Sequence, residues 1–462
     1  MLFNSLPFLY LFLPITYFIF WKLTTRSQRY IWLTVTGYFF YSFWNYKFCA
    51  LMALSTAVSY FAGLGFLKWD DPRHRRWCLI LPVTFDLLLL AIFKYANFTL
   101  ITARSLAESL GFSLSLPVLD IVLPVGISFY TFHTITYIVD SYRRVITPTR
   151  NIFEFSCYVS LFSQLVAGPI VRFREIEKDL EHIHLPDRSA MLQQGTSYFV
   201  LGMIKKVILA DTIAAVINPA LTHWTTLSSA GAWMCMLGYS YQLYFDFSGY
   251  SEMAVGLGLM FGLRLPQNFN SPYQAIDIAD FWRRWHISLS SILRDYLYVP
   301  LGGNRYGTFA TYRNLMITML LGGLWHGAGW TFIIWGGYHG LLLSLTRIFS
   351  QPLKKWPLWL KTSTTFLLVV IGWTFFRADN FPMALGILQK MFFWTPGAPI
   401  AGSFSLLVFL SLAAGLAHFG PNVFELSHQW KPLAALSLSA LFIVCLFLIY
   451  GRQDSPFLYF QF

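Results

Sequence analysis

An all-α membrane fold with many crossings is predicted by two features of the sequence. Only 12% of the 462 residues are charged while 56% are hydrophobic, whereas an average soluble domain has roughly 25% charged residues. Apolar runs close to the ~20 residues that span a bilayer recur along the whole chain. A segment in lipid must satisfy its own backbone hydrogen bonds, so we expect these runs to be helices.

The lengths of the apolar runs predict about eleven crossings. The clearest runs occupy residues 6–21, 30–44, 48–67, 195–217, 232–263, 313–326, 328–349, 362–376, 404–419 and 433–450. The first run has no basic segment before it and no small-residue cleavage site after it, so we expect a retained span rather than a signal peptide. We expect residues 1–350 to form the main bundle and residues 351–462 to add helices to the same domain.

The net charge of +12 is concentrated in intervals between the apolar runs. Three intervals hold much of it: Lys22, Arg26 and Arg29; Lys68, Arg73, Arg75 and Arg76; and Arg143, Arg144 and Arg150. By the positive-inside rule these loops are cytoplasmic, which places the N-terminus outside. A nucleic-acid partner is therefore not needed to explain the charge.

Two runs are interrupted. Segment 119–138 contains Pro124 and Gly126, and segment 152–170 ends in LVAGPI before the charged stretch 171–188. Non-helical backbone at membrane depth survives only where protein buries it or where it lines a cavity. We therefore expect re-entrant pieces around an internal site, and we expect stretch 171–188 to be a cytoplasmic surface helix.

The stretch LLGGLWHGAGWTFIIWGGYHG (320–340) carries His326 within an apolar run. Glycines at i,i+4 spacing surround it: Gly323, Gly327, Gly336 and Gly340. Such spacing lets helices approach closely, which explains the glycines but not the histidine. Ionisable residues inside spans usually face an interior site, and imidazole is a common general base near neutral pH, so a catalytic role and a structural one have equal weight. His339, 13 residues on, is expected on another helical face.

A second polar cluster lies in DIADFWRRWHISLSSILRDYLY (277–298), which we expect to be one helix containing His286. Asp280 and Arg284 have the i,i+4 spacing of an ion pair, and Arg283 and Arg294 are expected on one face. An interfacial helix with snorkelling arginines and an aromatic belt is the simpler interpretation, and composition favours it.

The functional alternative for this stretch is the wall of a charged tunnel. There, Arg283, Arg284 and Arg294 would hold the phosphates of an acyl-CoA donor. Trp282 and Trp285 would line the same tunnel beside His286.

Four further positions are weaker candidates for binding substrate. Asp246 lies in an apolar run, where an ion pair to a neighbouring helix is favoured over a proton relay. Asn268 lies in the turn LPQNFNSPY (265–273), where capping of backbone groups is its simpler role. Asp140 ends an interrupted run and has Arg143 as a possible helix-end partner. Trp325 adjoins His326.

Several reaction classes have no motif here. The sequence has no GxSxG elbow, no HExxH and no repeated acidic pair, and its five cysteines are scattered without CxxC or metal-ligand spacing. A built-in serine hydrolase, a metalloprotease and a metal site are therefore not predicted. We expect no bound cofactor.

Taken together, four blocks resemble the membrane-bound O-acyltransferases over nearly the whole chain. They are YFDFSGYSEMAVGLGLMFG, LPQNFNSPYQAIDIADFWRRWHISLSSILRDYLYVPLGGNR, LLGGLWHGAGWTFIIWGGYHG and the terminal FLYFQF. The resemblance is to the branch that contains the membrane subunit of bacterial alginate O-acetylation. Relatives in this branch acetylate alginate, cellulose or peptidoglycan, and a cousin transfers D-alanine to teichoic acids.

The resemblance implies a fold, a reaction and site residues. His326 matches the catalytic histidine of the GLWHG block, and His286 matches the second histidine, which lines the transfer tunnel. The implied fold is a ring of tilted helices around a central funnel in the bacterial inner membrane. Acetyl-CoA enters from the cytoplasm, and the acetyl group passes to an extracytoplasmic polysaccharide, directly or through a serine of a separate SGNH-type acetyltransferase.

A transporter or flippase for a polysaccharide or a lipid-linked sugar is the alternative from another functional class. Broken helices and polar residues near the bilayer midplane are also typical of transporters. The sequence has no visible inverted repeat and few intramembrane carboxylates, which favours the enzyme.

Overall fold

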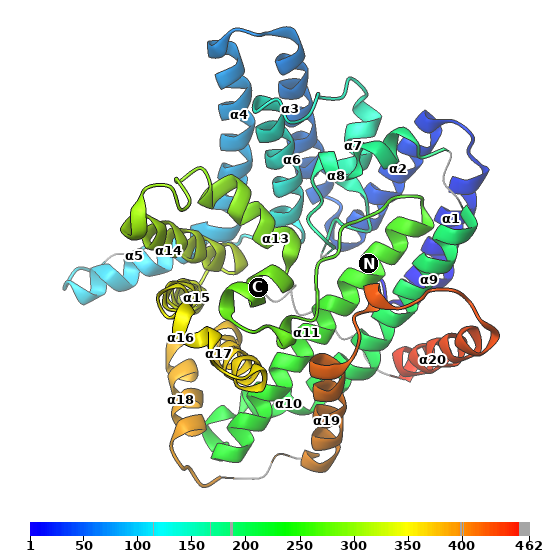
Figure 1. Ribbon diagram of the computed structural model, residues 1–462. Coiled ribbons are helices and arrows are strands. Elements are labelled where there is room, and N and C mark those ends of the chain that lie inside the picture. Colours follow the sequence, from blue (N-terminus) through cyan, green and yellow to red (C-terminus); the bar gives the residue numbers. More distant parts are fainter. Residues whose placement is uncertain (114, 167, 185–187, 398–399, 401, 452–462) are drawn as a thin grey trace. The chain divides into compact units, whose positions relative to one another are not determined.

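The computed structural model describes residues 1–113, 115–166, 168–184, 188–397, 400 and 402–451, and regular structure in these ranges is helical (Figure 1). The all-α prediction is therefore confirmed. The terminal FLYFQF block, at 457–462, and residues 185–187 of the charged stretch lie outside the described residues.

The chain divides into two compact units. The first comprises Met1–Thr196 and Ala254–Pro266, and the second comprises Ser197–Met253 and Gln267–Phe462. Two helices contribute to both units: α9 (Arg188–Ile204) and α11 (Ser229–Met260).

The first unit contains eight further α-helices and two short π-helical segments among its described residues. They are η1 (Phe8–Phe12), α1 (Leu13–Lys22), α2 (Arg26–Asn45), α3 (Phe48–Lys68), α4 (Pro72–Leu90), η2 (Ala91–Tyr95), α5 (Ala96–Ser109), α6 (Ile127–Tyr142), α7 (Ile152–Ser160) and α8 (Phe173–Glu181). Helices α3, α4 and α6 pack against one another (Figure 1).

The buried carboxylate of Asp86 connects these three helices. Ser55 Oγ on α3 donates a hydrogen bond of 2.6 Å to its Oδ1, and Thr134 Oγ1 on α6 donates one of 2.6 Å to its Oδ2.

At the start of α4, Asp71 accepts hydrogen bonds from the backbone of Arg73 and His74. The backbone and ring of His74 are the main reason why the pKa of Asp71 is lowered.

Both interrupted runs are interrupted in the structure. Residues 115–124 are non-helical, and α6 begins only after Gly126, whose φ of 75° is the left-handed conformation that glycine tolerates. Of the described residues in the other run, those of α7 are helical and the rest are not. The charged stretch forms α8 over about half of its expected length, and three apolar side chains on one face of this helix are buried: Phe173, Ile176 and Leu180.

The second unit contains the remaining helices. They are η3 (Lys205–Ala210), α10 (Asp211–Thr222), η4 (Trp224–Thr226), η5 (Pro272–Gln274), α12 (Ile278–Arg284), α13 (Ile287–Ile292), η6 (Leu293–Tyr298), α14 (Gly307–His326), α15 (Trp330–Ile348), α16 (Ser350–Lys354), α17 (Leu358–Arg377), α18 (Phe381–Phe392), α19 (Ser403–Phe419), η7 (Val423–Glu425) and α20 (Pro432–Gly451). Within this unit α15 packs against α14, α12 and α17, and α17 also packs against α18.

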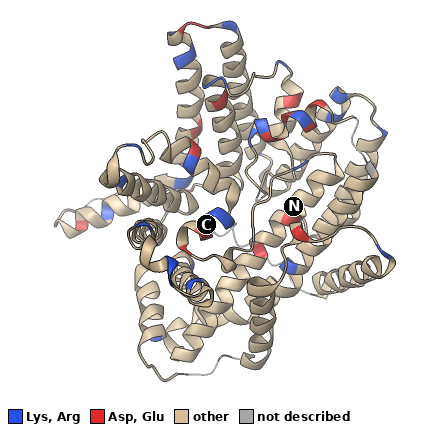
Figure 2. Cartoon of the chain, viewed as in Figure 1, with Lys and Arg blue, Asp and Glu red and all other residues tan. Residues whose placement is uncertain are grey.

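Four helical stretches of the described chain are long and apolar enough to cross a membrane: Phe48–Lys68, Pro72–Ser109, Leu358–Arg377 and Pro432–Gly451. Phe8–Lys22 and Ser403–Phe419 are shorter apolar helices. Figure 2 shows basic residues gathered at the connection between α3 and α4, which is one of the predicted cytoplasmic loops. Long stretches of helix in both units carry few charges.

Close backbone packing joins α14 to α15. A Cβ on Gly323 would collide with the carbonyl oxygen of Phe332, and a Cβ on Gly336 would collide with that of Met319. The two glycines also face each other, because a Cβ on Gly323 would lie 3.1 Å from the Cα of Gly336. The glycines therefore set the distance between the two helices.

Replacing Gly336 by alanine is expected to destabilise the protein by about 1–3 kcal/mol, because the added methyl group forces two backbones apart. The measurement is the midpoint of thermal unfolding in detergent. Gly337→Ala is the matched control, since a Cβ there meets only the flexible end of Leu320, at 3.4 Å. Equal midpoints for the two variants would contradict the packing role of Gly336.

Candidate active site

His326 is the last residue of α14, and its side chain is buried, with 4% of its surface exposed. The helix ends there because Gly327 is extended, and α15 begins at Trp330 after a short turn. The predicted boundary between runs 313–326 and 328–349 falls at this turn. His326 is thus held at a helix end inside the protein.

Three aromatic rings contact the His326 imidazole edge to face. Ring centroids lie 4.9 Å away for Trp325, 5.0 Å for Trp335 and 5.3 Å for Phe376. Trp335 in turn stacks on Trp373 at 5.8 Å. These contacts come from α14, α15 and α17, so the orientation of the imidazole depends on the packing of three helices.

His339 belongs to the same cluster, although the spacing of the sequence predicts a different face from that of His326. Its ring lies 4.9 Å from that of Trp335, so Trp335 contacts both histidines. Trp282 Nε1 donates a hydrogen bond of 3.3 Å to His339 Nδ1. Because Nδ1 accepts, the ring hydrogen of the neutral imidazole lies on Nε2. The i,i+4 spacing of Trp335 and His339 is the signal that points to this pairing.

The expected single helix over 277–298 is wrong. Helix α12 ends at Arg284, His286 has a left-handed φ of 44°, and α13 starts at Ile287. Arg283 and Arg294 therefore do not lie on one face of a continuous helix. The break turns the His286 side chain away from the direction that a helix would give it.

The neighbouring turn supplies the hydrogen bonds that the break removes. The backbone N–H of Asn270 donates to the carbonyl of Arg284 at 2.9 Å, and that of Ile287 donates to the carbonyl of Asn268 at 2.9 Å. The side-chain Oδ1 of Asn268 accepts the N–H of Ser288 at 3.1 Å. Asn268 therefore caps backbone, as its simpler interpretation predicts, but it caps α13 rather than its own turn.

The two predicted histidines are connected through one tryptophan. The His286 ring lies 6.2 Å from Trp325, whose ring contacts His326 at 4.9 Å. Trp285, on the other side of the break, stacks on Phe281 and lies 4.9 Å from Trp373. Both histidines and the predicted Trp282, Trp285 and Trp325 thus belong to one buried aromatic cluster in the second unit, in which His286 is fully buried.

Each of the three predicted arginines has a carboxylate partner. Asp280 binds Arg284 at 3.0 Å, as the i,i+4 spacing predicts, and binds Arg283 at 3.4 Å. Arg294 makes two contacts, of 2.7 and 3.3 Å, with Asp295. The side chains of Arg283 and Arg294 nevertheless remain 66% and 64% exposed.

Asp246 is part of a buried charged group. Lys206 Nζ lies 2.7 Å from Asp246 and 2.7 Å from Asp211, and all three side chains are less than a tenth exposed. The structural alternative for Asp246, an ion pair with a neighbouring element, is the arrangement observed.

Asp140 belongs to the first unit. Its carboxylate lies 3.8 Å from the guanidinium group of Arg174, which is on another helix, so the predicted helix-end partner Arg143 does not account for all of its contacts.

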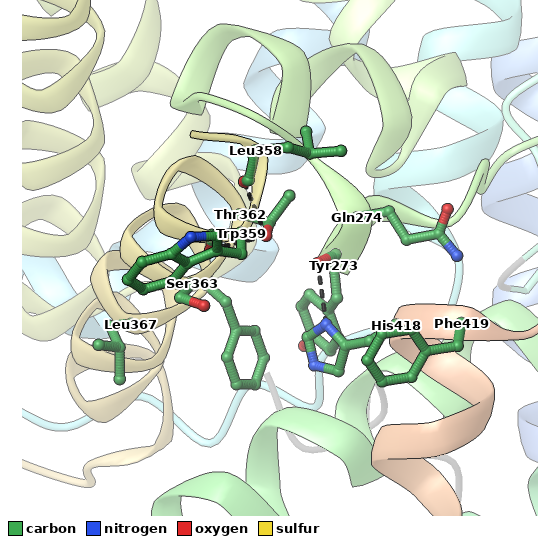
Figure 3. Close-up of a pocket in the computed structure, with 10 residues that line it drawn as sticks. Tyr273, Gln274, Leu358, Trp359, Thr362, Ser363, Leu367, His418 and Phe419 are labelled. Atoms are coloured by element: carbon green, nitrogen blue, oxygen red, sulfur yellow. Dashed lines mark hydrogen bonds between the residues drawn. The ribbon is translucent and has the colours of Figure 1, made fainter. Parts of the chain in front are cut away.

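A cavity of about 710 Å³ opens beside η5 and the ends of α17 and α19 (Figure 3). Apolar side chains such as Trp359, Phe366 and Phe419 form much of its wall. His418 Nδ1 donates to the carbonyl of Tyr273, and His418 Nε2 accepts from Tyr241. None of the predicted site residues lines this cavity. Contacts lead from its wall to the site, however, because Trp373 donates to the Tyr273 hydroxyl at 3.2 Å.

The chain matches the family model of the membrane-bound O-acyltransferase family over residues 94–377. The chain belongs to this family. The match includes both histidines and the glycine-rich hairpin of α14 and α15. The chain is therefore a multi-pass membrane protein and an O-acyltransferase, which favours the enzyme over the transporter. No group of acidic, histidine and cysteine side chains within the described ranges could hold a metal ion.

The names of curated relatives of this O-acyltransferase refer to the acylation of bacterial polymers. A protein named "Probable alginate O-acetylase AlgI" from Pseudomonas putida is 42% identical over the full length of both chains. One of the same name from Pseudomonas aeruginosa is 46% identical, over 85% of this chain and 75% of its own. A peptidoglycan O-acetyltransferase from Helicobacter pylori is 39% identical, over 85% of this chain and 80% of its own.

Replacing Lys206 by methionine is expected to destabilise this O-acyltransferase strongly, by about 3–5 kcal/mol, because two buried carboxylates lose their common cation. The measurement is the yield of monodisperse protein and its thermal midpoint. The triple variant Lys206→Met/Asp211→Asn/Asp246→Asn carries no charge at the group and should recover much of the loss. A wild-type midpoint for the single variant would contradict this account.

Proposed function

We propose that this protein transfers an acetyl group from cytoplasmic acetyl-CoA for the O-acetylation of an extracytoplasmic polysaccharide similar to alginate. The observation that carries this proposal is His326, held at a helix end within an aromatic cluster of an O-acyltransferase. The names of its relatives support acetyl as the group and a bacterial polymer as the acceptor.

In the proposed reaction, His326 acts as general base. It takes the proton from an acceptor hydroxyl, whose oxygen attacks the carbonyl carbon of the thioester. The tetrahedral intermediate then collapses, the carbon–sulfur bond breaks, and the leaving CoA thiolate takes the proton from the His326 imidazolium, which restores the neutral base. The ester remains on the acceptor. The aromatic rings around His326 exclude water, which limits hydrolysis of the thioester.

The proposal also includes the surroundings of the reaction. About eleven crossings would form a funnel in the bacterial inner membrane, with the N-terminus outside and the basic loops in the cytoplasm. Residues 1–350 would form the catalytic bundle, and residues 351–462 would add helices to the same domain. The acetyl group would pass to the polysaccharide directly or through a serine of a separate SGNH-type acetyltransferase.

Other polar residues have supporting roles in this proposal. Arg283, Arg284 or Arg294 would bind the phosphates of acetyl-CoA, for which Arg283 is best suited because it is exposed and its contact with Asp280 is long. His286 would assist the transfer beside His326. Asp140 and Asp246 would order water or hold neighbouring groups in place.

Replacing His326 by alanine is expected to lower the rate of acetyl transfer by about 10²- to 10⁴-fold, the usual value of general-base assistance. The measurement is release of free CoA thiol from acetyl-CoA by the purified protein with an acceptor. His223→Ala, which changes an exposed histidine outside the cluster, is the matched control. Normal release by a folded His326→Ala variant would refute the assignment.

Replacing Arg283 by glutamine is expected to raise the KM for acetyl-CoA by roughly tenfold to a hundredfold with little change in kcat, because one charge-assisted hydrogen bond to phosphate is lost. Acetyl-pantetheine lacks the nucleotide phosphates and should react equally well with both proteins. A similar loss with acetyl-pantetheine would show that Arg283 acts on something other than phosphate.

A further inference from the structure

The side-chain amide of Asn268 is fixed in one orientation. This residue is 1% exposed, and its Oδ1 accepts from the backbone N–H of Ser288 at 3.1 Å and from Ser288 Oγ at 2.8 Å. Because a backbone N–H can only donate, the amide atom that faces it is the oxygen. The amide therefore cannot be turned over without placing its NH₂ group against another donor.

The oxygen of Asn268 also determines the tautomer of His286. Nδ1 of His286 lies 3.2 Å from Asn268 Oδ1, which is an acceptor. Nδ1 must then carry the ring hydrogen, and the lone pair of the neutral imidazole lies on Nε2. One end of the amide thus positions the second histidine of the site.

The nitrogen end of the same amide is unused. Asn268 Nδ2 is buried and has no hydrogen-bond partner among the described residues. A buried NH₂ group without a partner is unfavourable and uncommon in native proteins, and a catalytic role is one of the reasons for which such a group is retained. Because the oxygen end is held by Ser288 and His286, the nitrogen cannot turn to find a partner within the protein.

The amide lies beside the catalytic cluster. The ring of the next residue, Phe269, contacts His286 at 6.4 Å and Trp285 at 5.0 Å. His286 and His326 both contact Trp325. The unused donor therefore belongs to a residue that contacts His286 directly, and the ring of Trp325 lies between His286 and His326.

We propose that Asn268 is a catalytic residue whose Nδ2–H donates a hydrogen bond to the carbonyl oxygen of the acyl thioester. This proposal rests on the acetyl-transfer function proposed above. When the acceptor oxygen attacks, negative charge develops on that carbonyl oxygen, and a donor fixed in advance stabilises it without reorganisation. Asn268 forms no covalent bond and transfers no proton; its oxygen holds His286 while its nitrogen binds the substrate.

Replacing Asn268 by aspartate distinguishes the role of the amide oxygen from the role of the amide nitrogen. Aspartate keeps an oxygen for Ser288 and His286 in the same shape, but it replaces the NH₂ donor by an oxygen. We expect kcat to fall by about 10²- to 10³-fold, the usual effect of removing one oxyanion donor. Asn270→Asp is the matched control, because it adds the same charge to the same turn at a half-buried side chain.

The rates should be compared at pH 7 and pH 9. A carboxylate beside His286 favours the protonated imidazole, and the higher pH removes that effect. A loss that persists at pH 9 in Asn268→Asp, and is absent in Asn270→Asp, supports the donor role. Recovery of the wild-type rate at pH 9 would show that the amide only positions His286 and would overturn the proposal.

A binding measurement tests the donor without turnover. S-acetonyl-CoA carries a carbonyl near the position of the thioester carbonyl, and S-propyl-CoA lacks it. The wild-type protein should bind the acetonyl compound at least several-fold more tightly, and Asn268→Asp should lose this preference while still binding S-propyl-CoA. An unchanged preference in the variant would overturn the role of Asn268. Failure of the wild-type protein to bind either compound would instead refute acetyl-CoA as the donor.

Discussion

The requirement that buried backbone groups be hydrogen-bonded shapes this site more than any other constraint. A helix in a membrane can be interrupted only where other protein groups bond the N–H and C=O groups that the interruption exposes. The turn at 268–270 does this for the break between α12 and α13, through two backbone bonds and the Oδ1 of Asn268. Those bonds hold His286 at a positive φ that a non-glycine residue rarely adopts.

His326 is positioned in a different way from His286. His326 ends α14 next to an extended glycine, and the hairpin with α15 is close because Gly323 and Gly336 have no side chains. Close approach brings Trp335 of α15 against the His326 ring, and Trp373 of α17 packs behind Trp335. A broken helix and a tight hairpin thus deliver two imidazoles to one aromatic cluster from separate parts of the second unit.

The three predicted arginines of the second unit are paired with carboxylates, whereas the wall of an open charged tunnel would leave such arginines unpaired. Asp280 binds two arginines and Asp295 binds a third, so none of the three guanidinium groups is without a carboxylate partner. Lys206 stands between Asp211 and Asp246, where it neutralises part of a buried acidic group. The charges of Lys206, Asp211 and Asp246 are thus paired within the protein, whereas the side chains of Arg283 and Arg294 are largely exposed.

The helical class, the interruption of two runs and the boundary after His326 could be predicted from the amino-acid sequence. Each follows from apolar run length, glycine spacing or a local motif, which are properties of neighbouring residues. The break at His286 could not be predicted, since residues 277–298 are locally compatible with one helix and the bonds that favour the break come from Asn268 and Asn270 in another segment. The same is true of the partners of His339 and Asp246. The contacts between side chains of different segments could be found only in the folded chain, because hydrogen bonds and ring contacts between segments depend on packing that no local pattern encodes.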